Sequence, residues 1–294
     1  MKMKIKIKIY QPLVCVLCAL MISSCQKEPS GNGGNGGLIN NTPSVKIMSF
    51  NIRTMSANDA HSWESRRDAC CAMINYHRPV MLGTQEAKKQ QREDILSRCR
   101  GYAAVAKNQD NTNDGQSTAI FYLRDSITVL DWGVFWHTDT PDKLSKLEEC
   151  DHYRSSTWVK TQHRTTGKIF YHINTHLDLC DVRNREKGMS VILDFISKNC
   201  EDYPVVMTAD WNDTEDDPIF NEMYKTFKNA RYTAPLTDKN QTFNGFGAFT
   251  DNWRIDHIFY RGFASCSKFG VDRQAWAGQK YISDHYPVWT ILHF

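Results

Sequence analysis

The sequence predicts an α/β fold of four layers (α/β/β/α), in which two mixed sheets pack face to face and helices cover their outer sides. Short apolar runs typical of strands interleave with longer amphipathic segments typical of helices along residues 44–294. Several consecutive strands lack a helix between them, which favours mixed sheets over a single parallel sheet. No repeat of fixed period is visible.

Each predicted strand is a short apolar run, and most are rich in β-branched or aromatic residues. In chain order the strands cover residues 45–50, 80–84, 118–123, 127–130, 157–161, 168–174, 205–208, 255–260 and 287–292. Helices are predicted over residues 63–77, 90–100 and 182–198. Ser62 is a suitable N-cap for the first helix, one face of which carries Ala69, Cys70, Met73, Ile74 and His77. The inward face of the last helix carries Val191, Ile192, Phe195 and Ile196.

The first 24 residues are predicted to be a lipoprotein signal peptide that takes no part in the fold. A stretch with four lysines, residues 2–8, precedes an apolar run over residues 12–22 that is too short to span a bilayer. The run ends in Ile22-Ser23-Ser24-Cys25, which resembles the lipobox of bacterial lipoproteins. This resemblance implies cleavage before Cys25, acylation of its thiol, and a membrane-anchored lipoprotein, periplasmic or on the cell surface. The alternative is an ordinary secretory signal with an incidental cysteine.

Residues 25–43 are predicted to be a flexible tether, because their glycine-rich and asparagine-rich composition cannot bury a core. Residues 44–294 contain no second segment of this kind and are expected to form a single domain. Without the four lysines of the signal, which contains no acidic residue, the net charge changes from +3 to −1. This balance argues against avid non-specific binding of duplex nucleic acid, which usually requires a basic face.

Cysteine is common in this sequence, with ten in all. Two lie in the signal and Cys25 is the presumed lipid anchor, so an odd number remains and these cannot all pair. No Cys-x-x-Cys or zinc-type spacing occurs. We expect mostly buried thiols, and the sequence leaves open whether one or two disulfides form among them.

Ionisable or amide residues stand directly where several predicted strands end. In α/β sheets such strand ends line the ligand crevice. The residues concerned are Asn51, Glu86, Asn174, His176, Asp210 and, two positions on, Asn212. Asp256 starts another strand, and Asp284 and His285 precede the last one.

In order along the chain, these segments resemble the motifs of the endonuclease/exonuclease/phosphatase superfamily, which includes DNase I, exonuclease III, inositol polyphosphate 5-phosphatases, bacterial sphingomyelinases and the deadenylases. The matching segments are Ser49-Phe50-Asn51-Ile52-Arg53, Gln85-Glu86, Asn174-Thr175-His176-Leu177, Asp210-Trp211-Asn212, Asp256-His257-Ile258 and Ser283-Asp284-His285-Tyr286-Pro287. Together with the signal, they are similar to a secreted branch found in gut Bacteroides-type bacteria. In a departure from the family pattern, Ala209 stands where glycine is usual.

The resemblance implies a divalent cation, Mg²⁺ or Mn²⁺, because a phosphoester is protected by its own negative charge. Glu86 would be its first ligand, supported by Asn51 and Asp284. Three further residues would contact the substrate: Arg53, Arg154 and Asn174. The structural alternatives are capping of a strand end for the two asparagines and a surface ion pair for Arg53.

The remaining motif residues would carry the chemistry. Asp210 would orient and deprotonate the attacking water, and Asn212 would hold that water or a phosphate oxygen. His285 would contact a non-bridging oxygen, with Asp256 within hydrogen-bond reach to orient the ring and favour its charged form. His176 would bond another phosphate oxygen near the leaving group.

The expected function is therefore hydrolysis of a phosphoester, either a monoester or a diester, by a monomer at the cell envelope. The substrate is left open among nucleic acid, inositol phosphate, phospholipid head group and phosphosugar, because the motifs handle only the phosphate. Loops over residues 58–63, 136–152 and 238–253 would select it, and Trp63, Trp136 and Trp211 are candidates for stacking there. The alternatives are a glycan-acting or glycan-binding surface lipoprotein, and a degenerate binding module on the same fold.

Overall fold

The structure, a computed structural model, describes residues 43–294 apart from residues 111 and 149. The predicted signal peptide and residues 25–42 of the predicted tether lie outside the described residues. Every described residue belongs to one compact unit, Asn41–Phe294. Within the described part, no helix combines the length and the apolar composition needed to cross a membrane.

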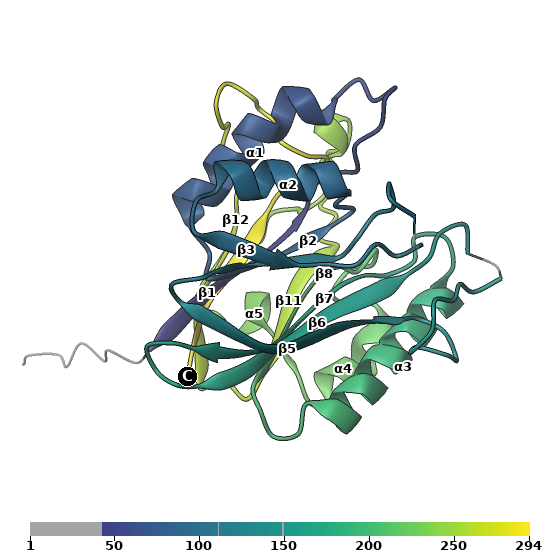
Figure 1. The fold of residues 1–294 in the computed structure, drawn as a ribbon, viewed down its shortest axis with the longest axis vertical. Helices are drawn as coiled ribbons and strands as arrows, with labels where there is room; N and C mark the ends of the chain where they lie inside the picture. The colour runs from purple at the N-terminus through teal and green to yellow at the C-terminus, as the bar shows by residue number, and fades with distance from the viewer. Residues whose placement is uncertain (1–42, 111, 149) are drawn as a thin grey trace, which may run out of the picture. The chain divides into compact units, whose positions relative to one another are not determined.

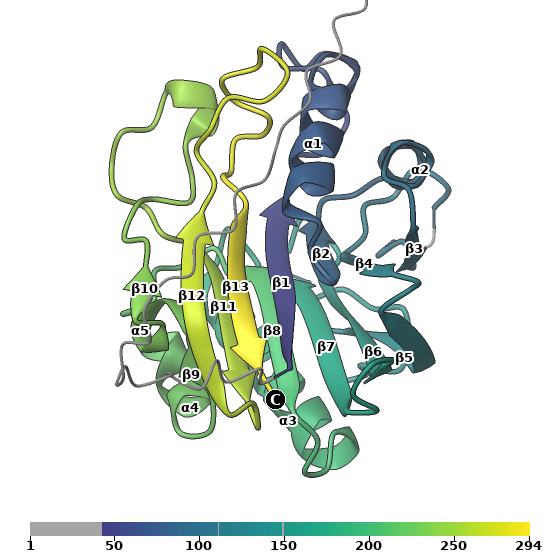
Figure 2. The same ribbon diagram turned by 90° about the vertical axis from the view of Figure 1, so that its left-hand side faces the viewer.

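Two mixed β-sheets form the centre of the molecule (Figure 1). The first sheet, which faces the viewer in Figure 2, has the strand order β10-β12-β13-β1-β2-β4-β3. Its strands are β1 (Ser44–Asn51), β2 (Met81–Gln85), β3 (Tyr102–Val105), β4 (Ala119–Leu123), β10 (Leu236–Thr237), β12 (Ser265–Val271) and β13 (Val288–His293). The second sheet has the order β5-β6-β7-β8-β11-β9. Its strands are β5 (Ile127–Trp136), β6 (Ser155–His163), β7 (Ile169–His176), β8 (Val205–Asp210), β9 (Lys228–Asn229) and β11 (Asp256–Arg261).

Helices cover the outer side of each sheet (Figure 1). Helices α1 (Trp63–His77) and α2 (Lys89–Arg98) pack on the first sheet. Helix α3 (Val182–Asn199) and the short α4 (Asn221–Tyr224) pack on the second. The short α5 (Ala230–Thr233) contacts β11 and β12, and 3₁₀ turns occur at Pro218–Phe220 and Gly245–Gly247. The predicted four-layer α/β/β/α sandwich is confirmed.

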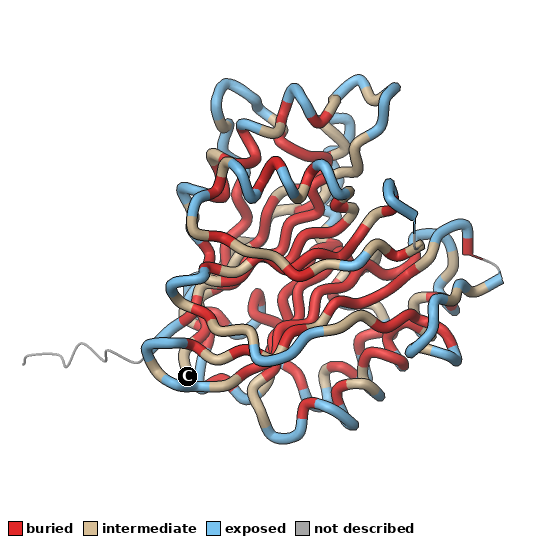
Figure 3. The backbone as a smooth tube through the Cα atoms, viewed as in Figure 1, coloured by how far each residue is buried: buried red, intermediate tan, exposed pale blue. Residues whose placement is uncertain are grey.

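Buried apolar side chains lie between the layers, and Figure 3 shows that the buried residues concentrate in the strands. The core between the two sheets includes Ile47, Phe170, Val206, Ile258 and Leu292. A second core lies between the first sheet and α1 and α2, and a third between the second sheet and α3. Strands in the middle of each sheet therefore pack against apolar side chains on both faces, which fixes their register.

The predicted helix signals operate as expected. Ser62 caps α1, because its Oγ accepts a hydrogen bond from the backbone N–H of Ser65 at 3.4 Å. On the predicted face of α1, the buried residues are Ala69, Cys70, Met73 and Ile74. On α3, Val191, Ile192 and Ile196 are buried, and Phe195 packs partly exposed against the same core.

Three strands of the first sheet, β3, β10 and β12, and the two-residue β9 of the second sheet were not predicted, and β5 runs beyond its predicted end at residue 130. The β3 segment contains Ala103 and Ala104, and β12 contains Ser265 and Lys268, all weak strand formers. These segments form strands because their backbones pair with β4 and β13, and their own residues do not indicate a strand. In β5 the pairing register shifts between Val129 and Asp131, and the strand continues past this bulge.

No disulfide bond joins the cysteines of the described residues. All seven of these cysteines are free, and only Cys180 is exposed. The expectation of mostly buried thiols is confirmed, and the open question of disulfides is answered for the described residues, whose cysteines are all free.

Strand pairing brings the polar strand ends together. Strands β1 and β2 are parallel, with Asn51 opposite Gln85. Strands β7 and β8 are also parallel, with His176 opposite Asp210, and the antiparallel β11 places Asp256 opposite Asp210. Because parallel strands present their carboxyl ends at one edge of a sheet, both sheets carry their polar ends at the same side of the sandwich.

Candidate active site

Asp210, the last residue of β8, lies at the centre of the candidate site. Its Oδ2 accepts a hydrogen bond from Nδ2 of Asn51 at 2.9 Å and lies 3.4 Å from Nε2 of His176 and 3.5 Å from Nε2 of His285. The contact with Asn51 joins the two sheets. Burial raises the pKa of the Asp210 carboxyl group to about 7, although the nearby His285 lowers it. A carboxylate that titrates near neutral pH is suited to take a proton from water.

His285 forms a hydrogen-bonded pair with Asp256, the first residue of β11. The ring Nδ1 lies 2.9 Å from Oδ2 of Asp256, which confirms the predicted contact. Burial lowers the pKa of His285, but the carboxylates of Asp256 and Asp210 outweigh burial and hold this pKa well above its usual value. His285 is therefore a cation between two carboxylates.

Asp210, Asp256 and His285 also offer ligand atoms within 4.8 Å of one another, a spacing that a metal ion could use. A metal bound there would have to displace the proton that the two carboxylates stabilise on His285. Acid–base chemistry suits this trio better, and a hard cation is better served by oxygen donors elsewhere in the site.

Glu86 and Asp284 supply such oxygen donors beside Asn51. Glu86 accepts hydrogen bonds from Nδ2 of Asn51 at 3.0 Å and from the backbone N–H of Thr54 at 2.9 Å. Oδ2 of Asp284 lies 3.2 Å from Nη1 of Arg53. Burial lowers the pKa of Arg53, but Asp284, Glu86 and Asp59 raise it to a net increase, so one guanidinium serves three carboxylates. The uncompensated charge and the carboxylate oxygens fit Mg²⁺ or Mn²⁺.

The backbone is in the left-handed region at three of the predicted site residues. Arg53, Glu86 and Asn212 have φ angles of 55°, 64° and 54°. Such conformations cost on the order of 1 kcal/mol or more for residues other than glycine and persist where the surroundings enforce them. Each of the three follows directly, or within two residues, the end of β1, β2 or β8. The chain therefore turns sharply after β1, β2 and β8.

Arg66 of α1 holds two of these segments together and was not predicted from the sequence. This buried guanidinium donates hydrogen bonds to four backbone carbonyl groups, those of Ile52 (2.6 Å), Arg53 (2.9 Å), His61 (2.8 Å) and Ile282 (3.1 Å). Two of these carbonyls flank the turn after β1, and Ile282 precedes the Ser283-Asp284-His285 segment. Arg66 thus ties the turn after Asn51 to the segment that carries His285.

Asn212 lies next to the site and orders it. Its backbone N–H donates to Oδ1 of Asp210 at 3.0 Å, and its Nδ2 donates to the carbonyl of Leu177 at 2.9 Å. These bonds fix the second oxygen of Asp210 and the chain directly after His176.

Asn174 does not offer an amide group to the substrate. Its Nδ2 donates to the carbonyls of Thr84 (2.8 Å) and Ala119 (2.9 Å), and its Oδ1 accepts from Nε2 of Gln85 (2.7 Å) and Oγ1 of Thr208 (3.0 Å). The side chain is fully buried and its hydrogen-bonding capacity is used within the protein. Asn174 therefore joins the two sheets, in place of the predicted contact with the substrate.

Arg154 and His176 lie on the other side of Asp210. Burial lowers the pKa of His176 well below its usual value, and the charge of Arg154 lowers it further, so this ring is neutral. Arg154 is 9% exposed, and its Nε lies 3.7 Å from Oδ1 of Asp178 without a hydrogen-bond partner among the described residues. A buried guanidinium with an unused donor is suited to bind an anion.

The predicted tryptophans are not available for stacking. Trp63, Trp136 and Trp211 are at most 2% exposed, and their indole N–H groups donate to protein acceptors. Exposed aromatic rings occur instead at Phe249 and Trp253, which adjoin the ring pair of the half-buried Phe243 and the buried His285. Sequence reasoning could not separate the buried tryptophans from the exposed Trp253, because the burial of each ring depends on which elements pack over it.

Comparison with known proteins agrees with this geometry. The family model described as "Endonuclease/Exonuclease/phosphatase family" matches residues 48–285. An endonuclease/exonuclease/phosphatase from Bacteroides vulgatus has a similar structure, with a TM-score of 0.80 and 27% identity over 86% of this chain and 99% of that one. A mannosyl-6-phosphatase from Bacteroides thetaiotaomicron is similar at a TM-score of 0.77 and 25% identity, covering 85% of this chain and all 100% of its own. Uncharacterized protein L388 of Acanthamoeba polyphaga mimivirus is 26% identical over 269 residues, 84% of this chain and 100% of the viral protein.

Proposed function

Because this chain belongs to the Endonuclease/Exonuclease/phosphatase family of phosphoester hydrolases, we propose that it hydrolyses a phosphoester with the help of a divalent cation, Mg²⁺ or Mn²⁺. Asp210 carries this proposal, because its carboxylate contacts Asn51, His176 and His285 where the two sheets meet. The glycan-cleaving alternative does not need the imidazole and amide groups around this carboxylate. The degenerate binding module would lack Glu86, Asp210 or His285, and all are present.

The cation would be held by Glu86 and Asp284, with Asn51 beside them. The Nδ2 of Asn51 faces Glu86, and its Oδ1 accepts from the backbone N–H of Arg53 at 3.0 Å. When bound, it neutralises charge on the phosphoryl oxygens and stabilises the leaving oxygen. Arg53 pairs with Asp59 at 3.4 Å and with Asp284 at 3.2 Å, and its side chain is 43% exposed, so it would exchange one of these partners to contact a phosphate oxygen. This placement supports both its predicted substrate contact and the alternative ion pair.

The residues proposed to transfer protons or donate hydrogen bonds differ in charge. Asp210 accepts a proton from the attacking water, and Asn212 holds the carboxylate in position through its backbone N–H. The cationic His285, oriented by Asp256, donates a hydrogen bond to a non-bridging phosphate oxygen. The neutral His176 donates to a second oxygen, and Arg154 adds positive charge on that side.

The metal assignment predicts the behaviour of Glu86→Gln. The variant should bind Mg²⁺ and Mn²⁺ at least about tenfold more weakly, because one anionic ligand becomes neutral. Its thermal unfolding without metal should be unchanged, since the amide keeps the shape of the side chain. Calorimetric titration measures the affinity, and kcat/KM should fall with it.

Glu93→Gln is the matched control, because Glu93 lies exposed on α2 and pairs only with Lys89 at 3.8 Å. Its metal affinity and rate should equal those of the unsubstituted protein. Unchanged metal affinity in Glu86→Gln would remove Glu86 from the cation site. Activity that persists in EDTA would refute the cation requirement itself.

We further propose that Cys25 carries lipid and that the enzyme works at the cell envelope, held by acyl chains. This proposal is supported by the signal and lipobox-like residues. Cys25→Ser should release the protein from the membrane fraction or leave its signal uncleaved. Cys180→Ser, which alters the one exposed cysteine of the described part, should leave the protein membrane-bound. Fractionation and intact mass decide the matter: a Cys25→Ser protein that is still cleaved and still membrane-bound contradicts it.

A further inference from the structure

Residues 242–245 lie beside the pair of Asp256 and His285. Phe243 forms a β-bridge with His285, and their rings meet edge to face with centroids 5.0 Å apart. The next two backbone N–H groups donate to the carbonyl of Asp284 at 2.7 and 3.1 Å. These contacts hold the segment that carries His285, but none of them reaches Asp256.

Thr242 contacts both sides of the pair. Its Oγ1 accepts hydrogen bonds from the backbone N–H groups of Ile255 and Asp256, both at 3.0 Å. Its carbonyl oxygen accepts from the N–H of Tyr286, the residue after His285, at 2.6 Å. The hydroxyl and the carbonyl of one residue therefore bind the two segments that supply the pair.

The buried position of Thr242 makes these bonds hard to replace. The residue is fully buried, so water is not at hand to accept from the N–H groups of Ile255 and Asp256. The carbonyl of Ile255 accepts from the N–H of Trp211 at 2.8 Å, which joins it to the chain directly after Asp210. The start of β11 is thus fixed between Thr242 on one side and the end of β8 on the other.

The Asp256–His285 pair tolerates little displacement. Its single hydrogen bond joins Oδ2 of Asp256 and Nδ1 of His285 at 2.9 Å, and such bonds weaken steeply as their geometry departs from the optimum. A misplacement of ~1 Å at a reacting group can lower a rate about 10²-fold. A residue that fixes the backbone on both sides of this bond therefore controls the rate without touching the substrate.

We propose that Thr242 is a positioning residue, which holds Asp256 and His285 at hydrogen-bonding distance through the backbones of their two segments. The inference rests on the proposed phosphoester hydrolysis and adds a residue that acts on it from a distance. Thr242 lies in the loop over residues 238–253, which was expected to select the substrate. Its buried hydroxyl instead serves the catalytic pair.

The first test measures kcat and KM for variants of Thr242. The substrates are p-nitrophenyl phosphate and bis(p-nitrophenyl) phosphate with Mn²⁺, and the faster of the two is used. Thr242→Val keeps the shape of the side chain and removes the acceptor, so kcat should fall about 30-fold. KM should stay within about threefold, because the pair acts in the transition state. Thr242→Ser, which keeps the hydroxyl, should retain kcat within about threefold.

A double variant shows whether Thr242 acts through the pair. When His285→Ala has already broken the pair, adding Thr242→Val should lower kcat by less than about twofold. Should Thr242→Val fail to fold, Thr242→Cys is compared with Thr242→Ser, from which it differs only in its acceptor atom. Sulfur is a weak acceptor, so the cysteine variant should be at least about fivefold slower, and equal rates would overturn the proposal.

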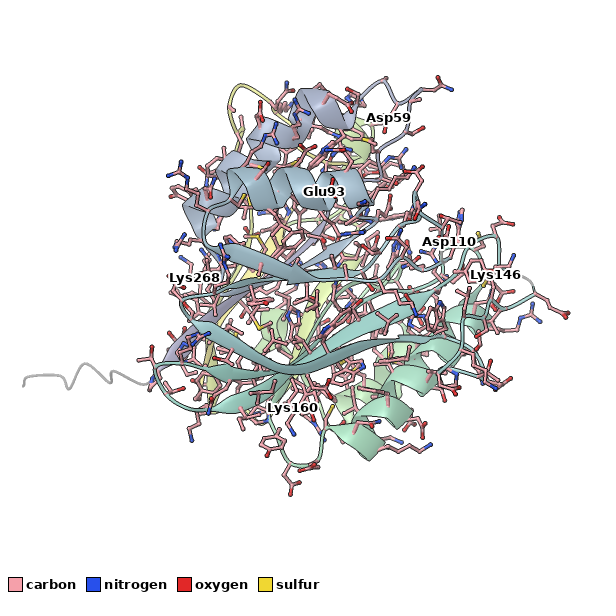
Figure 4. All side chains as sticks on the ribbon, viewed as in Figure 1. Asp59, Glu93, Asp110, Lys146, Lys160 and Lys268 are labelled. Carbon is pink, nitrogen blue, oxygen red and sulfur yellow. The ribbon has the colours of Figure 1, made fainter. Side chains whose placement is uncertain are left out.

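Thr161→Val is the matched control, because Thr161 is also fully buried and its hydroxyl donates to a backbone carbonyl of β7 at 3.1 Å. Figure 4 labels the neighbouring Lys160 toward the bottom of the molecule and Asp59, which pairs with Arg53 of the site, toward the top. The control loses a buried hydroxyl as Thr242→Val does, and it should keep kcat and KM.

A measurement without substrate separates this inference from the proposed hydrolysis. The Nδ1 proton that His285 donates to Asp256 should give a ¹H resonance far downfield, which His285→Ala identifies by its loss. This resonance should move or vanish in Thr242→Val and stay in place in Thr242→Ser and Thr161→Val.

An unmoved resonance in Thr242→Val would overturn the positioning role. Losses that multiply fully in the double variant, or a rise in KM at unchanged kcat, would overturn it as well. If the unsubstituted protein cleaves no phosphoester, the proposed hydrolysis fails, and the resonance alone decides whether Thr242 holds the pair.

Discussion

Replacing His285 by Ala should lower kcat/KM about 10³-fold, within the range typical of lost general acid–base and electrostatic stabilisation. The reason is the charge of this ring, which Asp256 at 2.9 Å and Asp210 at 3.5 Å keep protonated beside the reacting phosphate. Asp256→Asn should retain the geometry and lose part of this factor. Because the two residues act as a unit, the double variant should be little worse than His285→Ala alone.

The same pair predicts the direction of a pH shift. The protonated ring of His285 is the active form, so activity is lost as the pH rises through its pKa. Burial by itself lowers the pKa of His285, and the Asp256 carboxylate raises it. Removing that carboxylate in Asp256→Asn must lower this pKa, so the basic limb of the pH–rate profile should move to lower pH.

Steady-state rates would be measured from acidic to alkaline pH for the unsubstituted protein, His285→Ala, Asp256→Asn and the double variant. Glu222→Gln serves as a control, because its exposed carboxylate pairs with Lys225, directly after α4, and its loss should move neither limb. Losses that multiply fully in the double variant would mean that Asp256 and His285 act independently. A basic limb that stays in place in Asp256→Asn would show that His285 does not control it.

Replacing Arg66 by Met should destabilise the fold by about 3 kcal/mol, because several buried carbonyl groups lose their donor and each unsatisfied group costs ~1–3 kcal/mol. The expected fall in Tm is ~6–12 °C for a domain of this size. The carbonyls concerned belong to the turn after β1 and to Ile282, directly before the segment of Asp284 and His285. The variant should therefore also bind Mg²⁺ more weakly, since Asn51 and Asp284 would lose their fixed separation.

Arg67→Met provides the comparison, because the neighbouring Arg67 is partly exposed and only approaches Asp94, at 3.9 Å. Its Tm should change by less than about 2 °C, as for most surface substitutions. Denaturant unfolding and calorimetry measure both variants in the same way. Equal stabilities for Arg66→Met and Arg67→Met would mean that the four carbonyl contacts of Arg66 contribute nothing to the fold.

Several residues of the candidate site could be predicted from sequence patterns. Asn51, Glu86 and Asp210 were selected because each stands where an apolar strand ends, and the structure brings these three together. The pairing of Asp256 with His285 was also expected, and the structure places their side chains 2.9 Å apart. Such residues are predictable because the end of a strand and the edge of its sheet follow from local patterns.

Other contacts were not predictable in this way. Asn174 stands at a strand end like Asn51, yet its side chain points between the sheets and bonds to Thr84, Ala119 and Thr208. The strands β3 and β12 have weak local signals and exist because β4 and β13 present open edges to them. In both cases the outcome depends on which face or edge a neighbouring strand occupies.

The sequence by itself determined the fold class, the order of the motifs and the set of residues at the strand ends, because each of these depends on neighbours a few positions away. The tertiary structure alone decided the protonation of His176 and His285 and the role of Arg66. Arg66 meets the carbonyl of Ile282 across 216 positions of sequence, and the two histidines differ only in the buried charges that surround them. Burial and the charges of residues distant in sequence depend on how the chain packs, so no local sequence pattern predicts them.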